Sequence, residues 1–106
     1  MFGGGNMQGM VKKMQKMQAE MTKMQEEVKK REFETTVGGG VVKVVSDGNK
    51  ELLSVKIDPA ALNPDDVEML EDMIIAAVNE TRRKVDEVFE QEMGKITGGM
   101  KLPGMS

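Results

Sequence analysis

The sequence predicts an α+β fold with a long N-terminal helix, a three-stranded antiparallel sheet and a long C-terminal helix. Apolar residues recur at every third or fourth position near both ends of the chain, which is the period of an amphipathic helix. Between these stretches apolar and polar residues alternate, as they do in strands. A chain of 106 residues is enough for one small domain, which gains stability by burying surface against a partner subunit.

Residues 7–31 are predicted to form the first helix, because no Pro or Gly interrupts them after Gly9. Apolar side chains in it follow alternating steps of three and four, the a/d spacing of a coiled-coil seam. These residues are Met7, Met10, Met14, Met17, Met21, Met24 and Val28. Methionine specifies geometry poorly but adapts well, so two interpretations stay open: a soft dimer seam, or an adaptable groove for a protein client.

Three strands are predicted next, at residues 33–37, 41–45 and 50–57. Three consecutive glycines, residues 38–40, separate the first two, because such a run cannot hold a strand or helix against its own entropy. The sequence Asp-Gly-Asn at residues 47–49 predicts a hairpin turn in which the glycine takes a positive φ.

The middle strand is apolar on both faces, since Val42 and Val44 oppose Val41 and Val45. A single helix layer cannot cover both faces of a sheet, and natural proteins rarely leave strand edges open. A homodimer would resolve the uncovered face, the open edges and the methionine seam together. We expect the following residues at the dimer interface: Met14, Met17, Met21, Met24, Val42 and Val44.

The second helix is predicted to start at Asn63, with its side chain as the N-cap and Pro64 at the first helical position. It runs to about Met93. Residues 73–78 are apolar nearly all round and must be buried, whereas the part after Asn79 is mostly charged. We expect the first half to pack on the sheet and the second half to project.

Both ends of the chain are rich in glycine, so residues 1–6 and 94–106 are predicted to be flexible. Residues 7–93 are the predicted domain. No stretch approaches the ~20 consecutive apolar residues of a membrane span, and the N-terminus lacks the apolar run of a signal peptide.

The composition argues against an enzyme. The chain has no His, Cys, Tyr or Trp, so the usual pairs of nucleophile and base are impossible. The glycine-rich segments lack the Gly-Lys-Ser/Thr that a phosphate-binding loop needs. Thioethers favour Cu(I), but no His or Cys completes a copper site, so packing is the better account of the methionines. We expect no catalytic residue, no metal, no cofactor and no small-molecule substrate.

Charge is divided unequally along the chain. Residues 7–31 carry seven Lys/Arg and three Glu, a net charge of +4, whereas residues 51–92 carry four Lys/Arg and twelve Asp/Glu, a net charge of −8. The overall net charge of −3 conceals this division.

The first helix has a lysine flank. Lys16, Lys23 and Lys30 share one heptad position at intervals of ~10.5 Å, and Lys12 and Lys13 sit nearby. Such a flank can lie along a phosphate backbone. The competing interpretation is that Lys16 and Lys23 pair with the glutamates four residues on, and spacing alone does not decide between the two.

A second basic cluster occupies residues 82–84 on the projecting half of the second helix. Asp86 and Glu87 stand four residues from Arg82 and Arg83, so a neutralised surface is the competing interpretation here.

Several segments, in this order, resemble the YbaB/EbfC family of bacterial nucleoid-associated proteins. They are MFGGGNM, KMQKMQAEM, KMQEE, GGGVVKV with its following Asp-Gly turn, SVKIDPAAL, EMLEDMIIAAVNE and the Gly-Gly-Met…Pro-Gly tail. The resemblance covers essentially the whole chain. It implies a homodimer whose long helices project from a shared sheet like tweezers, and a non-enzymatic role in binding and reshaping chromosomal DNA. Composition and periodicity do not predict that role.

With this resemblance, we expect a cytoplasmic, nucleoid-located homodimer that binds double-stranded DNA. Phosphate contacts are expected chiefly from Lys12, Lys13, Lys16 and Lys23, with Arg82 and Arg83 secondary. The alternative is a protein-interaction module whose methionine-rich helix holds a helical client.

Overall fold

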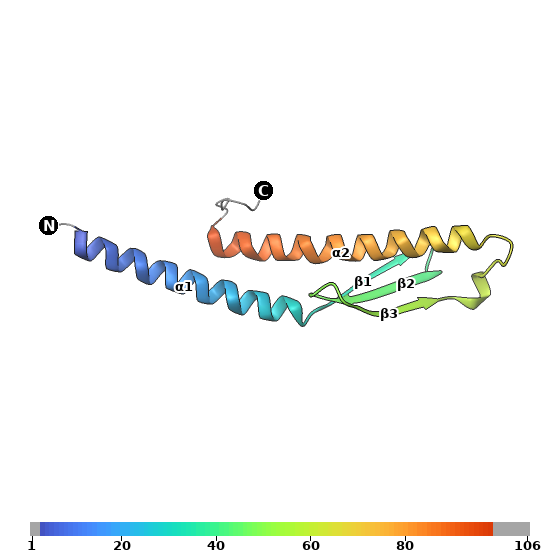
Figure 1. The fold of residues 1–106 in the computed structure, drawn as a ribbon, viewed down its shortest axis with the longest axis horizontal. Coiled ribbons are helices and arrows are strands. Elements are labelled where there is room, and N and C mark those ends of the chain that lie inside the picture. The colour runs from blue at the N-terminus through green and yellow to red at the C-terminus, as the bar shows by residue number, and fades with distance from the viewer. Residues whose placement is uncertain (1–2, 99–106) are drawn as a thin grey trace.

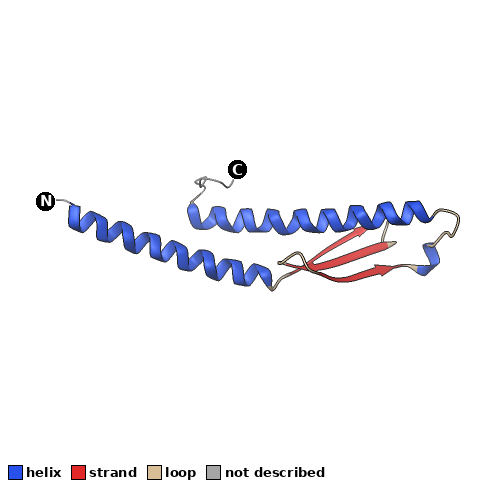
Figure 2. Cartoon of the chain, viewed as in Figure 1, coloured by secondary structure: helices blue, strands red, loops and turns tan. Residues whose placement is uncertain are grey.

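The computed structural model describes residues 3–98, and their side chains from Gln8 onward. Two long helices and a three-stranded antiparallel sheet make up the fold, which confirms the predicted α+β class (Figures 1 and 2). The elements in order are α1 (Gly3–Lys29), β1 (Glu32–Val37), β2 (Val42–Asp47), β3 (Leu52–Ile57), a short 3₁₀ helix η1 (Pro59–Ala61) and α2 (Val67–Thr97).

The sheet has the strand order β1-β2-β3, and α2 packs across β1 and β2 on one face (Figure 1). Thr35 of β1 pairs with Val44, which pairs in turn with Val55 of β3. The register between β2 and β3 shifts at Val45/Ser46, which is a β-bulge. Because α2 lies over β1 and β2, the side chains of β3 stay largely exposed.

Apolar burial falls into two clusters, both under α2. In the first, Val42 and Val44 of β2 pack against Ala77, near the middle of α2. In the second, Met24 and Val28 of α1 pack with Phe33, Val85 and the following turns of α2. The first half of α2 therefore covers the sheet as predicted. Its second half was expected to project, but it covers the end of α1 instead, because its apolar residues pack on Met24 and Val28.

The reverse face of the sheet is more polar than predicted. Val41 precedes β2, so within the strand this face carries Val45 beside Lys43, whose ammonium pairs with Glu34 at 3.2 Å. Alternation along a strand explains the result, because Val42 and Val44 both point toward α2.

The start of α2 differs from the prediction. Asn63 caps a turn, with its side-chain oxygen accepting the N–H of Asp65 at 3.0 Å. The helix itself begins at Val67, and Asp66 is its N-cap through a 3.2 Å bond from the N–H of Met69. Asn63 and Asp66 can both act as capping residues, and the helix starts after the second of them.

The outer ends of both helices differ from the prediction, since α1 begins at Gly3, four residues earlier, and α2 ends at Thr97, four residues later. Of the segments predicted to be flexible, residues 1–2 and 99–106 lie outside the described residues. The radius of gyration is 20.5 Å, well above the ~13 Å of a compact domain of this size. The excess arises because the N-terminal half of α1 extends beyond the end of α2 (Figure 1). Neither described helix has an apolar stretch long enough to cross a membrane.

Candidate nucleic-acid interface

The predicted lysines of α1 are all exposed: Lys12, Lys13, Lys16 and Lys23. Helical spacing places Lys12, Lys16, Lys23 and Lys30 along one side of the helix, and we call this set the lysine row. Among the described residues none of the ion pairs involves α1, so the competing interpretation, in which Lys16 and Lys23 pair with Glu20 and Glu27, finds no support in the structure. The row is therefore a strip of unpaired positive charge.

The two arginines of α2 differ from each other. Arg83 donates two hydrogen bonds to the Glu80 carboxylate, from Nη2 at 2.6 Å and from Nε at 3.1 Å. This hydrogen bonding and the arginine charge lower the pKa of Glu80. Arg82 is exposed and takes part in no ion pair within residues 8–98. Asp86, its expected partner, is paired with Lys50 instead, at 2.6 Å.

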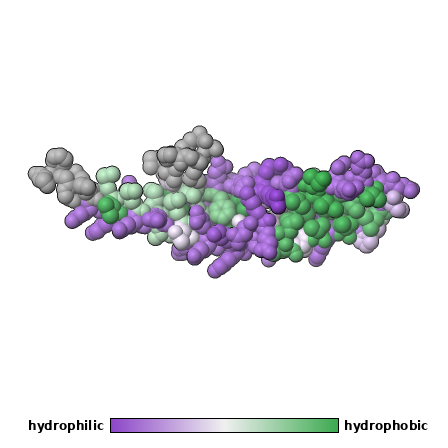
Figure 3. Space-filling model, viewed as in Figure 1, coloured by the Kyte–Doolittle hydropathy of each residue, from purple (hydrophilic) through white to green (hydrophobic). Residues whose placement is uncertain are grey.

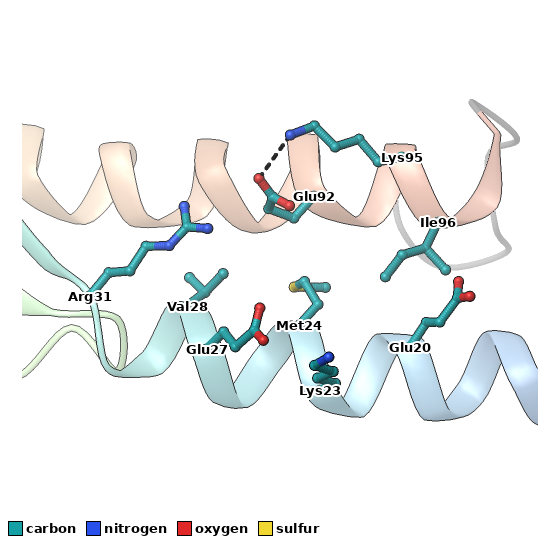
Figure 4. A pocket seen from close by; sticks show the side chains of 9 residues that line it. All are labelled: Glu20, Lys23, Met24, Glu27, Val28, Arg31, Glu92, Lys95 and Ile96. Carbon is teal, nitrogen blue, oxygen red and sulfur yellow. Dashed lines mark hydrogen bonds and ion pairs between the residues drawn. The ribbon is translucent and has the colours of Figure 1, made fainter.

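A cleft of about 260 Å³ separates the end of α1 from the end of α2 (Figure 4). Three cations and three carboxylates line it together with apolar side chains. The charged residues are Lys23, Arg31, Lys95, Glu20, Glu27 and Glu92. Lys95 already pairs with Glu92 at 3.1 Å. The cleft is thus close to neutral, although Lys23 of the lysine row lies at its edge. The positive charge that favours an anion is on the flank of α1, where Lys12 and Lys16 lie outside the cleft.

The residues expected at a dimer interface have unlike surroundings. Val42 and Val44 are fully buried, and Met24 nearly so, under the α2 helix of the same chain. Met17 and Met21 are half-buried, whereas Met14 is 66% exposed. The burial of the first three residues therefore needs no partner.

Another apolar surface lies at the sheet end of the molecule, where α2 leaves β3 uncovered (Figure 3). The large apolar residues that β3 and the first half of α2 expose at this end include Leu52, Leu53, Val55, Val67 and Ile75, each at least 41% exposed, and we call this set the β3–α2 patch. These residues were not predicted to form an interface. The sequence did contain a signal for an apolar contact, because Ile75 belongs to the apolar run of residues 73–78 that was expected to be buried, and it is 58% exposed instead.

These features define a class: an elongated α+β protein with an apolar patch at its sheet end and a projecting basic helix. The chain belongs to the YbaB/EbfC DNA-binding family, whose model matches residues 3–100. It is 54% identical over 102 residues to a nucleoid-associated protein of Pelotomaculum thermopropionicum, covering 96% of this chain and 97% of the relative. A nucleoid-associated protein of Desulforamulus reducens is 56% identical over 102 residues, with 96% and 97% covered.

A solved structure supports the fold alone. The crystal structure of an uncharacterized protein from Helicobacter pylori matches with a TM-score of 0.70 and 23% identity, covering 92% of this chain and 100% of that one. The alternative of a module for a helical client finds no support in any of these similarities.

Proposed function

We propose that this chain is a non-enzymatic protein of the bacterial nucleoid that binds double-stranded DNA as a homodimer and alters its conformation. The observation that carries the proposal is the unpaired lysine row on a helix that extends beyond the rest of the molecule. Membership of a DNA-binding family and the names of the similar proteins support it. Residues 7–93 are the proposed DNA-binding unit.

Segregated charge allows an acidic protein to bind a polyanion. Carboxylates just before and within the first turn of α2 lie at the sheet end, and the exposed ones include Asp65, Asp66 and Glu68. Lys12 and Lys16 lie toward the opposite end of a molecule 78 Å long. At physiological salt the Debye length is about 8 Å, so DNA at the tip of α1 is screened from those carboxylates.

The dimer is proposed to form through the β3–α2 patch. Monomeric proteins rarely expose a contiguous apolar surface of this kind unless it is an interaction site. A second copy offers the same apolar surface, which is how a two-fold interface is built. Two α1 helices would then project from a joint sheet region as the two arms of a tweezer, with Met14, Met17 and Met21 a further predicted contact.

Contact with phosphates positions a protein on DNA without reading its sequence. The chain has three aromatic residues, all Phe, which leaves few side chains for stacking on bases. Affinity should therefore depend weakly on sequence. About four to six phosphate contacts per dimer would give a log–log salt slope near −4 to −5, at ~0.9 per contact.

The test is fluorescence anisotropy with two unrelated duplexes, each titrated at several salt concentrations. Reversing Lys12 and Lys16 to Glu should weaken binding to both duplexes by at least about tenfold and flatten the slope. Reversing Lys43 and Lys56 to Glu is the charge-matched control, because both lie in the sheet, away from the α1 tip. Equal losses in the two double variants would refute phosphate contact by the lysine row.

Sedimentation at low micromolar concentration tests the dimer. Ile75→Lys should yield a folded monomer, because it places a charge in the β3–α2 patch. Met69→Lys is the control, since both residues are 58% exposed but Met69 lies near Val37 of β1. The two side chains are about 120° apart around the helix axis. A wild-type chain that sediments as a folded monomer would contradict the dimer.

A further inference from the structure

The turn between β2 and β3 packs against the C-terminal end of α1. Its residues are 47–50, and Gly48 is buried in the contact. The N–H of Gly48 donates a hydrogen bond of 3.1 Å to the carbonyl of Lys29, the last residue of α1. The final carbonyls of a helix have no partner within it, so this bond satisfies one of them with backbone from the sheet.

Only glycine leaves enough room at this contact. A Cβ on Gly48 would lie 2.6 Å from the Cα of Lys29, and closer still to the carbonyl oxygen of Val28. Both are backbone atoms, so no side chain can move aside to relieve the clash. Contrary to the prediction, Gly48 is not among the residues with positive φ; Lys50 is, at 65°. Gly48 is thus required for close approach and not for conformation.

The turn is held in shape and also reaches the other helix. Oδ1 of Asp47 accepts hydrogen bonds from the N–H of Asn49 at 2.8 Å and from that of Glu51 at 3.0 Å. The ammonium of Lys50 lies 2.6 Å from the carboxylate of Asp86 on α2. The same four-residue turn therefore contacts the end of α1 and the middle of α2.

The base of α1 has few other constraints. Only two residues, Lys30 and Arg31, connect it to β1. Met24 and Val28 pack on α2, but they span about one turn of helix, and methionine adapts to small changes in packing. A tilt of about 10° at Lys29 would move Lys12, ~25 Å away along the axis, by about 4 Å. A small change at the base therefore displaces the far end of the lysine row, at Lys12, by more than an ion pair tolerates.

We propose that the β2–β3 turn is a positioning element that sets the direction of α1, and with it the place of the lysine row on DNA. Gly48 and Asp47 are the positioning residues, and neither needs to touch DNA. The part that concerns DNA rests on the proposed function, whereas the part that concerns the direction of α1 stands on its own.

The direction of α1 is measurable as a distance between two spin labels. The chain has no cysteine, so Gln15→Cys on α1 and Gln91→Cys on α2 supply unique labelling positions, and both residues are exposed. Labelled protein is mixed with an excess of unlabelled protein, so that distances within one chain dominate. Double electron–electron resonance then gives the distribution of the distance from α1 to α2.

Four variants are compared in this background. Gly48→Ala and Asp47→Ala should shift or broaden the distance distribution, the first by steric conflict and the second by loosening the turn. Asp47→Asn keeps an oxygen acceptor and should restore the wild-type distribution. Gly39→Ala is the control: it strains a turn residue with φ of 69°, but a Cβ there meets nothing within 4 Å. Circular dichroism checks that each variant is folded.

The same variants are titrated with duplex DNA. Gly48→Ala and Asp47→Ala should weaken binding several-fold and lower the salt slope, while Asp47→Asn and Gly39→Ala should not. An unchanged distance distribution in folded Asp47→Ala would overturn the proposal, and this variant decides alone if Gly48→Ala does not fold. A changed distribution with unchanged DNA affinity would overturn the DNA part. If the lysine reversals leave DNA binding intact, the proposed function fails while the distance result still stands.

Discussion

The two halves of α1 carry the same methionine pattern but have different surroundings. In the C-terminal half, Met24 is 6% exposed and packs against α2 together with Val28. In the N-terminal half, Met14 is 66% exposed and Met10 is 64% exposed. The residue type and the spacing are the same in the two halves, so the difference in exposure comes from whether α2 lies opposite that half of α1.

The end of α2 decides which half is covered. The two helices run antiparallel, and Ile96 in the last turn of α2 still packs with the cluster around Met24. The next helical residue, Thr97, is the last one. Periodicity therefore identifies the residues that share a face of a helix, but the length of the neighbouring element determines how much of that face is buried.

The largest expected effect is on stability, and the matched pair is Met24→Ala and Met14→Ala. Truncating the buried methionine should lower the free energy of unfolding by about 2–4 kcal/mol, because it leaves a cavity between α1 and α2. Truncating the exposed one should change it by less than about 0.5 kcal/mol. Urea denaturation followed by circular dichroism gives both values.

The variants Met24→Ala and Met14→Ala also test whether the N-terminal half of α1 is buried in a dimer. A cost for Met14→Ala comparable with that for Met24→Ala would mean that the N-terminal half of α1 is covered in the dimer. The two halves would then be equivalent in solution, and the predicted partner contact of Met14 would gain direct support.

A smaller effect is expected when methionines are exchanged for leucine. The triple change of Met14, Met17 and Met21 to Leu conserves volume and should cost less than about 1.5 kcal/mol per site in unfolding free energy. The dimer should persist in sedimentation. Titration with Cu(I) provides the chemical control, since tight stoichiometric binding that the triple change abolishes would make the stripe a metal site and not a packing surface.

Local patterns were sufficient to predict the elements of the fold. The alternation around Thr35 and the glycine run at 38–40 predicted β1 and the following turn, and the capping residues near Asp66 predicted the start of α2 within three positions. Each signal comes from the chemistry of neighbouring residues. Long-range packing is not encoded in this way, which is why Val42 and Val44 were expected at a partner's surface and are covered by α2 instead.

In the candidate site too, features that depend on neighbouring residues were predictable, and features that depend on distant segments were not. Exposure of the lysine row was predictable, because charges on a helix flank seldom bury. The role of Gly48 was not, since its requirement arises from the backbone of α1, about twenty residues away in the chain. Similarly, Asp86 pairs with Lys50 rather than with its helical neighbour Arg82. Contacts between segments distant in the chain determine both the requirement for glycine at position 48 and the ion-pair partner of Asp86.

The basic cluster of α2 offers a weaker test of the comparison, because its two arginines differ in their ion pairing. Arg83 must break its ion pair with the Glu80 carboxylate to reach a phosphate, whereas Arg82 has no ion pair among the described residues. Arg82→Ala should therefore lower DNA affinity more than Arg83→Ala, with a loss of salt slope of about one or less. Anisotropy titrations at several salt concentrations measure this difference, and a larger loss for Arg83→Ala would show that the ion pair opens on binding.

The smallest effect is the dependence of stability on pH through Glu80. Its pKa is lowered in the folded chain, first by the hydrogen bond from Arg83 and then by the charge of the same side chain. A carboxyl group with a lowered pKa contributes stability above its unfolded pKa of about 4.3, and this contribution disappears as the pH falls through the folded pKa. The pair is exposed, so the contribution is small.

Arg83→Ala removes the two largest causes of the lowered pKa of Glu80 and leaves the smaller effect of the Lys84 charge, whereas Arg82→Ala removes none of them. The deficit in unfolding free energy of Arg83→Ala should therefore be present near neutral pH and be lost in acid, as the pH falls through the folded pKa of Glu80. Urea denaturation at the two pH values measures it, with Arg82→Ala expected to show the same deficit at both. A deficit of Arg83→Ala that persists in acid would assign the effect to packing of the arginine stem. The basic cluster of α2 would then be less neutralised than its ion pair indicates, and its contrast with the lysine row of α1 would be smaller.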